Sequence, residues 1–214
     1  MVATSGEPKN KWGLAAVAVT GTVAVGLCVI SAPFVTPALR KHCLPFVPAT
    51  ARQIANVIHM CKYNGPRLNS SLRELSNLEF KARTRESESL IDLGSGDGRI
   101  VLEAARHGIY SAGVELNAWL VLYSKLKARF TGLSRFAHFQ RNDLWKINLS
   151  KYDNIVIFGV AEMMPALKDK LMSEAKPDAK IIACRFPMPS WKPAESIDEG
   201  IDSVWLYYVN KQDT

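Results

Sequence analysis

Three glycines stand at alternate positions between a short apolar run and a helical segment. They are Gly94, Gly96 and Gly98. Glycine lets a backbone turn sharply and approach a bound ligand closely, because it has no side chain beyond Cα. A dinucleotide fingerprint needs its third glycine at position 99, which is Arg99 here, and a phosphate loop needs Gly-Lys-Ser/Thr at its end. The spacing therefore disfavours a nicotinamide or flavin site, and the end of a phosphate loop is absent.

A carboxylate stands where it could bind the sugar of such a ligand. Glu115 ends the next apolar run, 23 positions after Asp92 (115 − 92 = 23). A carboxylate there can accept hydrogen bonds from both ribose hydroxyls of an adenosyl group, as the corresponding acid does in dinucleotide folds. The alternative is that the glycines only form a turn and Glu115 is a solvated strand end. The order of both features on an alternating strand and helix pattern favours a cofactor site.

The Asp-x-Gly-x-Gly form of the loop resembles the first motif of class I methyltransferases, which implies S-adenosyl-L-methionine as the cofactor. By that resemblance Asp92 orients the loop, while Gly94 and Gly96 pass beside the methionine part. Asp143 resembles the acid that contacts the adenine amino group. The complete predicted cofactor-binding set is Asp92, Gly94, Ser95, Gly96, Asp97, Gly98, Glu115, Leu116, Asn117, Asp143, Leu144 and Phe158.

Short apolar runs alternate with helical segments from residue 89 onward, which is typical of a parallel sheet covered on both faces. Asn117 is a good N-cap, Gly108 and Gly132 can end helices, and Pro165 can open one. The predicted fold is a class I, seven-strand, Rossmann-like α/β methyltransferase with a doubly wound, mostly parallel sheet. Strands are expected at 90–93, 110–115, 136–141, 154–158, 180–186 and, as an antiparallel candidate, 203–209.

A long run without charged residues extends from Trp12 to Leu39. Gly13 to Ala32 alone contains 20 residues (32 − 13 + 1). That is about the length a helix needs to cross a bilayer core of roughly 30 Å. A signal peptide usually has a shorter apolar stretch and small residues at a cleavage site, and a buried core helix is the other alternative. We predict a single N-terminal transmembrane helix, and Arg40 and Lys41 after it favour a matrix-like side for the rest of the chain.

Four prolines follow the apolar core of this run and predict a stiff exit without regular helix. They are Pro33, Pro37, Pro45 and Pro48. Apolar spacing then predicts a helix over 50–62 and a basic amphipathic helix around Leu68 to Leu78, which either lies on anionic lipid or presents a solvated face. The predicted organisation is a tail (1–11), a transmembrane anchor (12–39), a Pro-rich exit with the basic helical segment (40–88), and an S-adenosylmethionine-binding domain (89–214).

Composition narrows the function only slightly. The 27 Lys and Arg residues exceed the 20 Asp and Glu residues, for a formal charge of +7. Such a charge suits nucleic acid, anionic lipid or an acidic protein surface, and does not choose among them. The four cysteines have neither a Cys-x-x-Cys pair nor a nearby His at zinc-ligand spacing. They predict free thiols and no metal site.

Longer strings resemble one family more closely. Many amino-methylating relatives carry Asn-Pro-Pro-Tyr after the fourth strand, but 158–165 reads Phe-Gly-Val-Ala-Glu-Met-Met-Pro, which disfavours a DNA-adenine or glutamine methyltransferase. Six strings of the sequence resemble the mitochondrial protein-lysine methyltransferases that modify the c subunit of ATP synthase or the adenine nucleotide translocase. They lie at 45–50, 92–101, 115–121, 143–146, 156–160 and 183–187. A seventh string, at 32–41, is most similar to the enzymes that modify the c subunit. An extra stretch at about 63–87, and Ala118 where proline is expected, depart from that pattern.

The resemblance implies a protein-lysine N-methyltransferase in the mitochondrial inner membrane, facing the matrix. Its implied substrate is the c subunit of ATP synthase or another mitochondrial membrane protein, with no nucleic-acid partner. A lysine amine has a reference pKa near 10.4, so such a site must favour the neutral form. The candidates for the lysine channel are Glu162, Trp145, Phe186 and Trp191. Aromatic walls stabilise a methylated ammonium, although the same aromatic residues equally suit core packing and Glu162 suits a solvated surface.

Two other functions remain open from the sequence alone. A methyltransferase of a lipid or small molecule would use a membrane helix and a basic surface equally well. A non-catalytic cofactor-binding scaffold is the second alternative, because the extra stretch at 63–87 could alter a cofactor lid or membrane docking.

Overall fold

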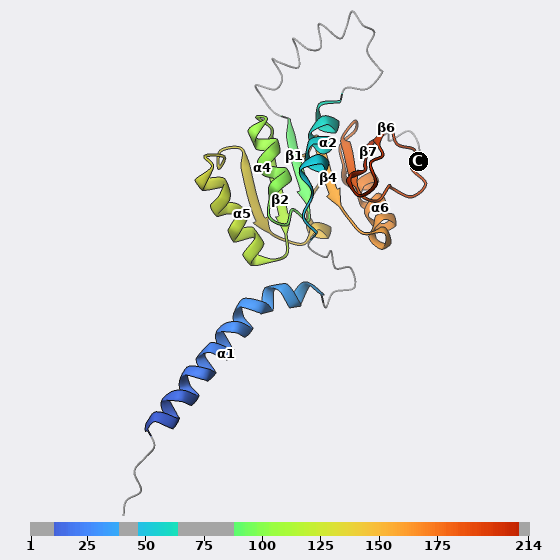
Figure 1. Cartoon of the computed structure of the whole chain (residues 1–214). Coiled ribbons are helices and arrows are strands. Elements are labelled where there is room, and N and C mark those ends of the chain that lie inside the picture. The colour runs from blue at the N-terminus through green and yellow to red at the C-terminus, as the bar shows by residue number, and fades with distance from the viewer. Residues whose placement is uncertain (1–10, 39–46, 64–87, 210–214) are drawn as a thin grey trace, which may run out of the picture.

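Seven strands form one mixed sheet at the centre of the C-terminal part of the chain (Figure 1). The computed structural model describes residues 11–38, 47–63 and 88–209. The sheet order is β3-β2-β1-β4-β5-β7-β6. The strands are β1 (Ser89–Leu93), β2 (Tyr110–Glu115), β3 (Ala137–Arg141), β4 (Asn154–Phe158), β5 (Lys180–Cys184), β6 (Glu195–Ile197) and β7 (Val204–Tyr208).

The first five strands are parallel, and β7 pairs antiparallel with both β5 and β6. The predicted doubly wound, mostly parallel sheet is therefore confirmed, including its antiparallel last strand. Strand order reverses between β1 and β4, so the crevice beside the carboxyl end of β1 is the switch point at which open α/β sheets bind ligands. β6 was not predicted, because its three residues are partly or fully exposed and carry no apolar pattern.

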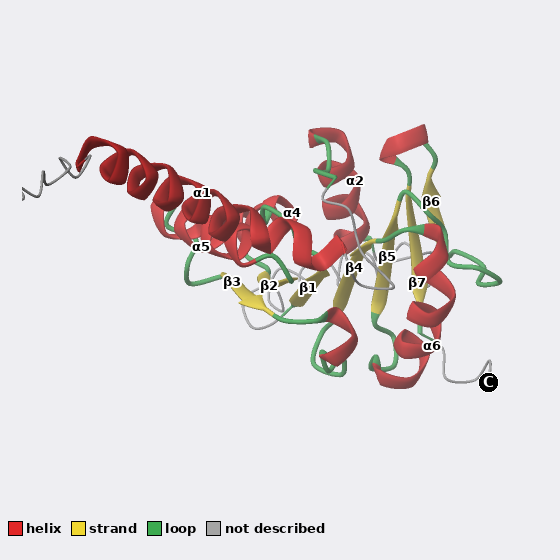
Figure 2. Cartoon of the chain, turned by 90° about the horizontal axis from the view of Figure 1, so that it is seen from below, coloured by secondary structure: helices red, strands yellow, loops and turns green. Residues whose placement is uncertain are grey.

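Helices cover both faces of the sheet (Figure 2). One face carries α2 (Ala51–Lys62), α4 (Arg99–Arg106) and α5 (Ala118–Phe130), and the other carries α6 (Met164–Glu174). Short 3₁₀ turns are η1 (Leu144–Lys146), η2 (Ala161–Met163) and η3 (Gly200–Asp202). Asn117 accepts the Trp119 N–H as the predicted N-cap of α5, and Gly132 follows its end in the left-handed region, at φ 71°.

Successive side chains of a strand point to opposite faces of the sheet, so the hydrophobic core is divided between the two faces. On β1, Leu90 packs with α2 and α4, whereas Ile91 and Leu93 pack with α6. All three side chains are fully buried. Each contributes about 1.5–3 kcal/mol through removal of its apolar surface from water, so the first strand is fixed from both sides before the glycine loop begins.

The helix α2 belongs to this core although it precedes the glycine loop by more than thirty residues in the sequence. Its apolar face, Val57, Met60 and Cys61, is fully buried against strand residues that include Val156 and Ile182. Thr50 caps the helix by accepting the Gln53 N–H. The amphipathic pattern predicted this helix within one residue, and the structure shows which surface covers it.

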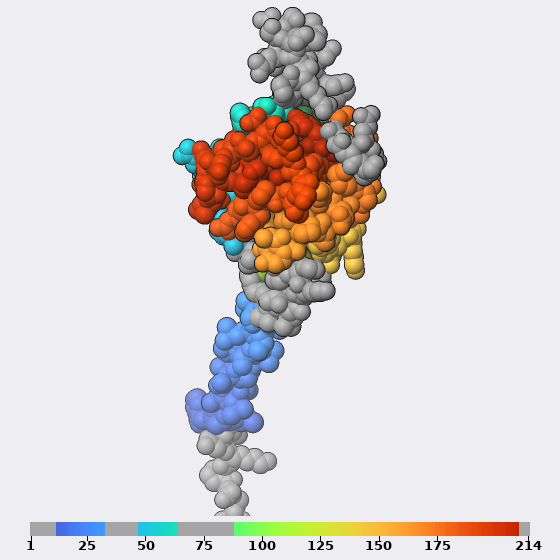
Figure 3. All heavy atoms as spheres, turned by 90° about the vertical axis from the view of Figure 1, so that its right-hand side faces the viewer, coloured from blue at the N-terminus to red at the C-terminus, as the bar shows by residue number. Residues whose placement is uncertain are grey.

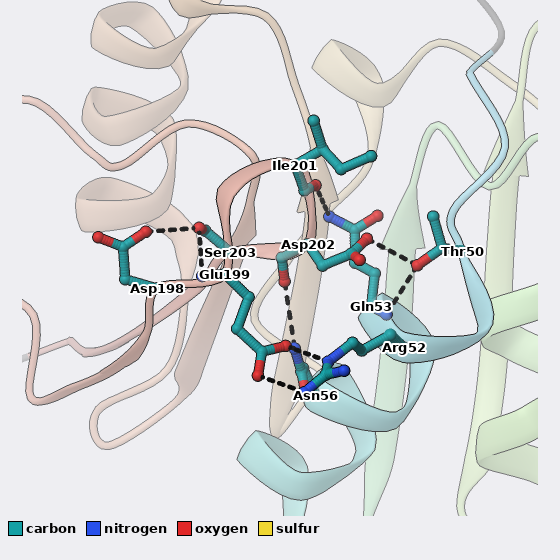
Figure 4. A network of polar contacts seen from close by, with 9 residues as sticks. All are labelled: Thr50, Arg52, Gln53, Asn56, Asp198, Glu199, Ile201, Asp202 and Ser203. Carbon is teal, nitrogen blue, oxygen red and sulfur yellow. Dashed lines mark hydrogen bonds and ion pairs between the residues drawn. The ribbon is translucent and has the colours of Figure 1, made fainter.

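A polar network also ties α2 to the connection between β6 and β7 (Figure 4). Thr50 donates to Asp202 Oδ1 at 2.6 Å, and the buried Gln53 donates to the Ile201 carbonyl at 3.1 Å. Arg52 pairs with Glu199 at 2.7 Å. These contacts join the first helix of the domain to its last strand pair.

The N-terminal helix α1 extends over Lys11–Ala38, which corrects one prediction. Pro33 and Pro37 were expected to exclude regular helix, but the helix continues through both. A proline removes one backbone donor and bends a helix without necessarily ending it, and Figure 1 shows α1 changing direction towards its C-terminal end. Trp12–Ala32 is long and apolar enough to cross a membrane and is not buried against the rest of the described chain. Arg40, Lys41 and the predicted helix at Leu68 to Leu78 lie outside the described residues.

Candidate active site

The glycine loop turns tightly over the end of β2. The N–H groups of Gly94 and Ser95 both donate to the Val114 carbonyl at 2.9 Å, and the Gly98 N–H donates to the Ser95 carbonyl at 2.8 Å. Gly94, Gly96 and Gly98 all have positive φ, at 90°, 52° and 75°. Residues with a Cβ adopt that region at a cost of roughly 1–2 kcal/mol each. The three predicted glycines are therefore required by the backbone path.

Glu115 fastens this loop to the start of α5. Its Oε2 accepts the Gly96 N–H at 3.1 Å, and its Oε1 accepts the Asn117 N–H at 2.8 Å. The carboxylate is partly exposed at the carboxyl end of β2. Each carboxylate oxygen has a second lone pair, so Glu115 can hold the loop and still accept hydroxyl donors from a ligand. The structure thus brings together three of the predicted cofactor residues, Gly96, Glu115 and Asn117.

Two buried polar atoms beside the loop lack a hydrogen-bond partner among the described residues. Asp92 Oδ1 and Ser95 Oγ make no hydrogen bond to any described residue. Burial raises the pKa of the Asp92 carboxyl to about 7, and the nearby charges of Glu115 and Asp97 act in the same direction. Unsatisfied buried polar groups are uncommon in folded proteins and mark functional places. Free acceptor and donor capacity here, with three glycines that leave the backbone open, fits an amino-acid-bearing nucleoside cofactor.

Close packing fixes the position of the loop from below. A Cβ placed on Gly98 would lie 2.6 Å from the Phe139 ring and 2.8 Å from Ser124 Oγ. A Cβ on Gly113 of β2 would lie 2.6 Å from Ser95 Oγ. Sequence reasoning did not single out Gly113, although a glycine inside a strand pattern indicates close approach of another segment.

Arg99 is the second residue that the sequence prediction did not use. Its Nη2 donates to Asp97 Oδ2 at 2.6 Å, and its Nη1 donates to the Ala49 carbonyl at 2.6 Å. Burial raises the pKa of the Asp97 carboxyl, but the hydrogen bonds and charge of Arg99 outweigh this effect and leave the pKa below its usual value. Arg99 therefore connects the glycine loop with the chain that enters α2.

The remaining predicted cofactor residues end or follow neighbouring strands. Asp143 follows β3 and caps η1 by accepting the Trp145 N–H at 3.1 Å. Leu144 is buried in the core and Leu116 is partly buried. Phe158 ends β4, with the Arg185 guanidinium 5.5 Å from its ring centre. Parallel strands end at one edge of the sheet, so these residues and the glycine loop share that edge.

The predicted lysine-channel residues are less closely grouped. Glu162 is exposed on η2, Trp145 packs partly buried against the α6 side of the core, and Phe186 is 38% exposed after β5. The Trp191 ring packs 5.1 Å from the ring of Tyr207, which pairs with Ile181 near the amino end of β5. That placement favours core packing for Trp191. Arg185, between β5 and Phe186, has a φ of 69°, a strained conformation for a residue with a side chain.

Comparison with known proteins identifies the family. A model of the ANTKMT methyltransferase domain matches residues 92–195, and one of the ATP synthase C-subunit lysine N-methyltransferase N-terminal domain matches residues 9–40. The chain is 46% identical over 199 residues to the ATP synthase C-subunit lysine N-methyltransferase of Homo sapiens, covering 93% of this chain and 76% of the relative. It is 45% identical over 204 residues to the Xenopus laevis enzyme of that name, covering 95% and 80%. The chain belongs to the ATP synthase C-subunit lysine N-methyltransferase family.

This membership makes the chain an S-adenosylmethionine-dependent methyltransferase. The adenine nucleotide translocase lysine N-methyltransferase of Mus musculus is more distant, at 40% identity over 146 residues, covering 68% of this chain and 63% of the relative. An RNA methyltransferase from Salinibacter ruber, solved with S-adenosyl-L-homocysteine, is 22% identical with a TM-score of 0.61, covering 76% of this chain and 94% of that one. The structural likeness confirms the fold, and the sequence relatives confirm the predicted family.

Proposed function

We propose that this chain methylates a lysine side chain of the ATP synthase c subunit at the mitochondrial inner membrane. The observation that carries the proposal is its 46% identity to the human enzyme named for that activity, over 93% of the chain. A separate family model over residues 9–40 extends the likeness to the apolar helix. The predicted anchor at 12–39 and methyltransferase domain at 89–214 are part of the same proposal, with α2 now added to that domain because it packs in the core of the sheet.

In this proposal the cofactor lies across the carboxyl ends of β1 and β2. Gly94 and Gly96 leave room for its methionine part, Glu115 accepts from its ribose hydroxyls, and Asp143 contacts its adenine. Asp92 and Ser95 offer buried polar atoms that have no hydrogen-bond partner in the part of the chain that the structure describes. S-adenosylmethionine supplies a methyl group on a positively charged sulfur, which a neutral amine can take up by direct displacement.

The protein must then deliver the lysine as a neutral amine in line with that methyl group. Alignment and exclusion of water can supply much of the rate without a strong general base. Phe186 and Trp145 are the aromatic candidates for the channel wall, since they follow strands at or near the edge that carries the glycine loop. Glu162 would attract the lysine cation at the entrance. Trp191 is the weakest of the predicted channel residues, because its ring packs on Tyr207.

The membrane part of the proposal rests on α1 and on where the chain enters the domain. Trp12–Ala32 has the length and composition of a single membrane span. The Ala49 carbonyl accepts from Arg99, directly after the glycine loop. The chain therefore enters the domain beside the glycine loop. This position supports a site that faces the bilayer and a substrate that is embedded in the membrane.

One labelling experiment tests the proposed function against its alternatives. The full chain is incubated with methyl-labelled S-adenosylmethionine and with separated mitochondrial proteins and lipids. We expect label on a lysine of a small, membrane-extracted protein that mass spectrometry identifies as the ATP synthase c subunit. Label in the lipid fraction would instead establish a lipid methyltransferase, and cofactor binding without transfer would establish a scaffold.

A truncated variant tests the tether. A chain that begins at Pro45 keeps Ala49 and the whole of α2, so we expect it to bind the cofactor and to methylate a soluble lysine peptide like the full chain. Tethering enzyme and substrate to one bilayer raises their effective concentration, to about the mM range for a short linker. The truncated chain should therefore modify the intact membrane substrate poorly. Equal loss on both substrates would show that residues 1–44 belong to the catalytic fold.

A further inference from the structure

The helix α5 presents a stripe of large apolar side chains to solvent. Five of them are between 39% and 83% exposed: Trp119, Leu122, Tyr123, Leu126 and Phe130. Successive residues are about 100° apart around a helix, so these five fall within an arc of about 100°. The buried face, made by Val121, Ser124 and Ala128, lies on the opposite side. The stripe is therefore a surface in its own right and not the rim of the core.

Cations flank the stripe on both sides. On the same helical projection Lys127 lies at one border and Arg129 at the other, with Lys125 beyond Arg129. The Lys127 ammonium lies 5.5 Å from the centre of the Tyr123 ring. The sequence from Leu116 to Asn142 contains no Asp or Glu but five Lys and Arg residues, at positions 125, 127, 129, 135 and 141. This whole end of the sheet, α5 with the edge strand β3, is therefore basic.

An apolar stripe with aromatic residues, bordered by Lys and Arg, is the arrangement of helices that lie in a membrane interface. The apolar side chains enter the headgroup boundary, while the cations reach lipid phosphates. A second copy of the chain fits this surface badly. A twofold contact through α5 would place Lys125, Lys127 and Arg129 of one copy against the same cations of the other.

We propose that the outer face of α5 docks on an anionic bilayer surface, as a second membrane contact beside α1. The chemistry that recognises it is a negatively charged lipid interface. Docking through α5 would hold the domain in one orientation instead of letting it rotate about its N-terminal connection. The stripe and its bordering cations lie between Trp119 and Phe130 and include no residue proposed to bind the cofactor.

A lipid-proximity measurement on the full chain tests the proposal. In one variant, Phe130→Cys, an environment-sensitive NBD label is placed on the stripe. In the control variant, Ile201→Cys, the label is placed on η3, at a position that is also apolar and 63% exposed but lies at the opposite end of the sheet. That opposite end is the red and orange surface in Figure 3. Cys28 and Cys43 are replaced by Ser in both variants, and the other two cysteines are buried. The chains are placed in nanodiscs of phosphatidylcholine, with or without phosphatidylglycerol and with nitroxide-labelled lipid as quencher.

We expect strong quenching at position 130 and little at position 201, in discs that contain phosphatidylglycerol. Each cation near an anionic surface favours the docked state about fivefold. Changing Lys125, Lys127 and Arg129 to Gln should thus lower the docked-to-undocked ratio by about a hundredfold, and discs without anionic lipid should act in the same direction. Unchanged cofactor affinity in these variants shows that the fold is intact.

Three results would overturn the proposal. Equal quenching at the two positions means that the domain has no preferred lipid face. A blue-shifted label at position 130 that lipid does not quench, and that depends on protein concentration, means that a second copy covers the stripe. Failure of the chain to co-elute with anionic discs excludes both membrane contacts. None of these readouts depends on methyl transfer, so they leave the proposed substrate to its own experiment.

Discussion

The cofactor half and the acceptor half of the proposed site differ in how their residues are held. In the cofactor half, Gly96 and Asn117 donate to one carboxylate, Glu115, and the loop is fixed by backbone hydrogen bonds to Val114. In the acceptor half, Glu162 and Phe186 are exposed and Trp191 packs against another ring. A cofactor that is always the same can be bound by a fixed backbone geometry. A pocket for the methyl acceptor instead uses side chains of types that also pack in the hydrophobic core.

Removing Glu115 should produce the largest effect and break the cofactor half. Glu115→Ala removes the proposed acceptor for two ribose hydroxyls, and each such charge-assisted hydrogen bond is worth about 1.5–3 kcal/mol. We expect S-adenosylmethionine affinity to fall at least about a hundredfold, measured by calorimetry. Glu162→Ala is the matched control in the acceptor half and should leave this affinity unchanged. A folded Glu115→Ala protein with normal affinity would show that the carboxylate only closes the loop.

The second prediction concerns Asp92 and pH. Folding raises its pKa from 3.8 to about 7, so the native state keeps a proton that the unfolded chain releases. Its stabilising contribution is present below pH 4 and is lost as pH rises towards 7, at about 1.4 kcal/mol per pH unit. Asp92→Asn stays neutral at every pH, so the free energy of unfolding of the variant should rise relative to that of the wild type between about pH 4 and about pH 7. Urea unfolding of both proteins at each pH, in the same detergent, measures this difference. Free energies of unfolding that change with pH in the same way in both proteins would contradict the prediction.

A pair of glycine substitutions separates backbone strain from close packing. Gly98 and Gly108 both have positive φ, at 75° and 79°. A Cβ on Gly98 would lie 2.6 Å from the Phe139 ring, whereas one on Gly108 would have no atom of the described residues within 4 Å. In both alanine variants a residue with a Cβ must adopt the left-handed backbone conformation, which lowers the free energy of unfolding of both. Gly98→Ala should lower it by about 1–3 kcal/mol more, because its methyl group overpacks the site. Equal losses in thermal unfolding would mean that the loop can shift away from Phe139.

The smallest effect is expected in the acceptor half. Phe186→Ala should raise the KM for a lysine peptide about two- to fivefold, because a cation–π contact at an exposed site is weak. Cofactor affinity should not change. Trp191→Phe should lower the melting temperature and leave this KM unaltered, since its ring packs on Tyr207. A larger KM effect from Trp191 than from Phe186 would reverse their proposed roles.

The sequence was sufficient for elements whose local pattern decides them. Tyr110–Glu115 and Asn154–Phe158 were predicted at their observed bounds, and Thr50 and Asn117 are caps because their side chains accept nearby N–H groups. Local pattern could not show that α2 covers Leu90 and Val156, because an amphipathic face does not specify its partner. The same limit explains why Arg99 was noticed only as a missing glycine, since the carbonyl it binds is that of Ala49, 50 residues earlier.

The acceptor residues show a different limit. Aromatic residues near strand ends serve binding and packing with the same side chain, so Trp145, Phe186 and Trp191 could not be separated by type. The prediction that regular helix stops at Pro33 failed because a missing donor bends a helix more readily than it stops one. Short edge elements such as β6 have too little apolar pattern to be found at all.

The position of β7 has a consequence for how the chain is made. This strand is the last of the sheet to leave the ribosome, yet it lies between β5 and β6 and pairs with Ile181, Ile182 and Ala183. Until it arrives, β5 exposes an unpaired apolar edge, which is a site for aggregation. The hydrogen bond from Thr50 to Asp202 joins residues that are 152 positions apart. The polar residues at the start of α2 therefore find these partners only after nearly the whole domain has been made. Folding that depends on such distant contacts is slow, so the edge of β5 stays exposed to aggregation until β7 has paired with it.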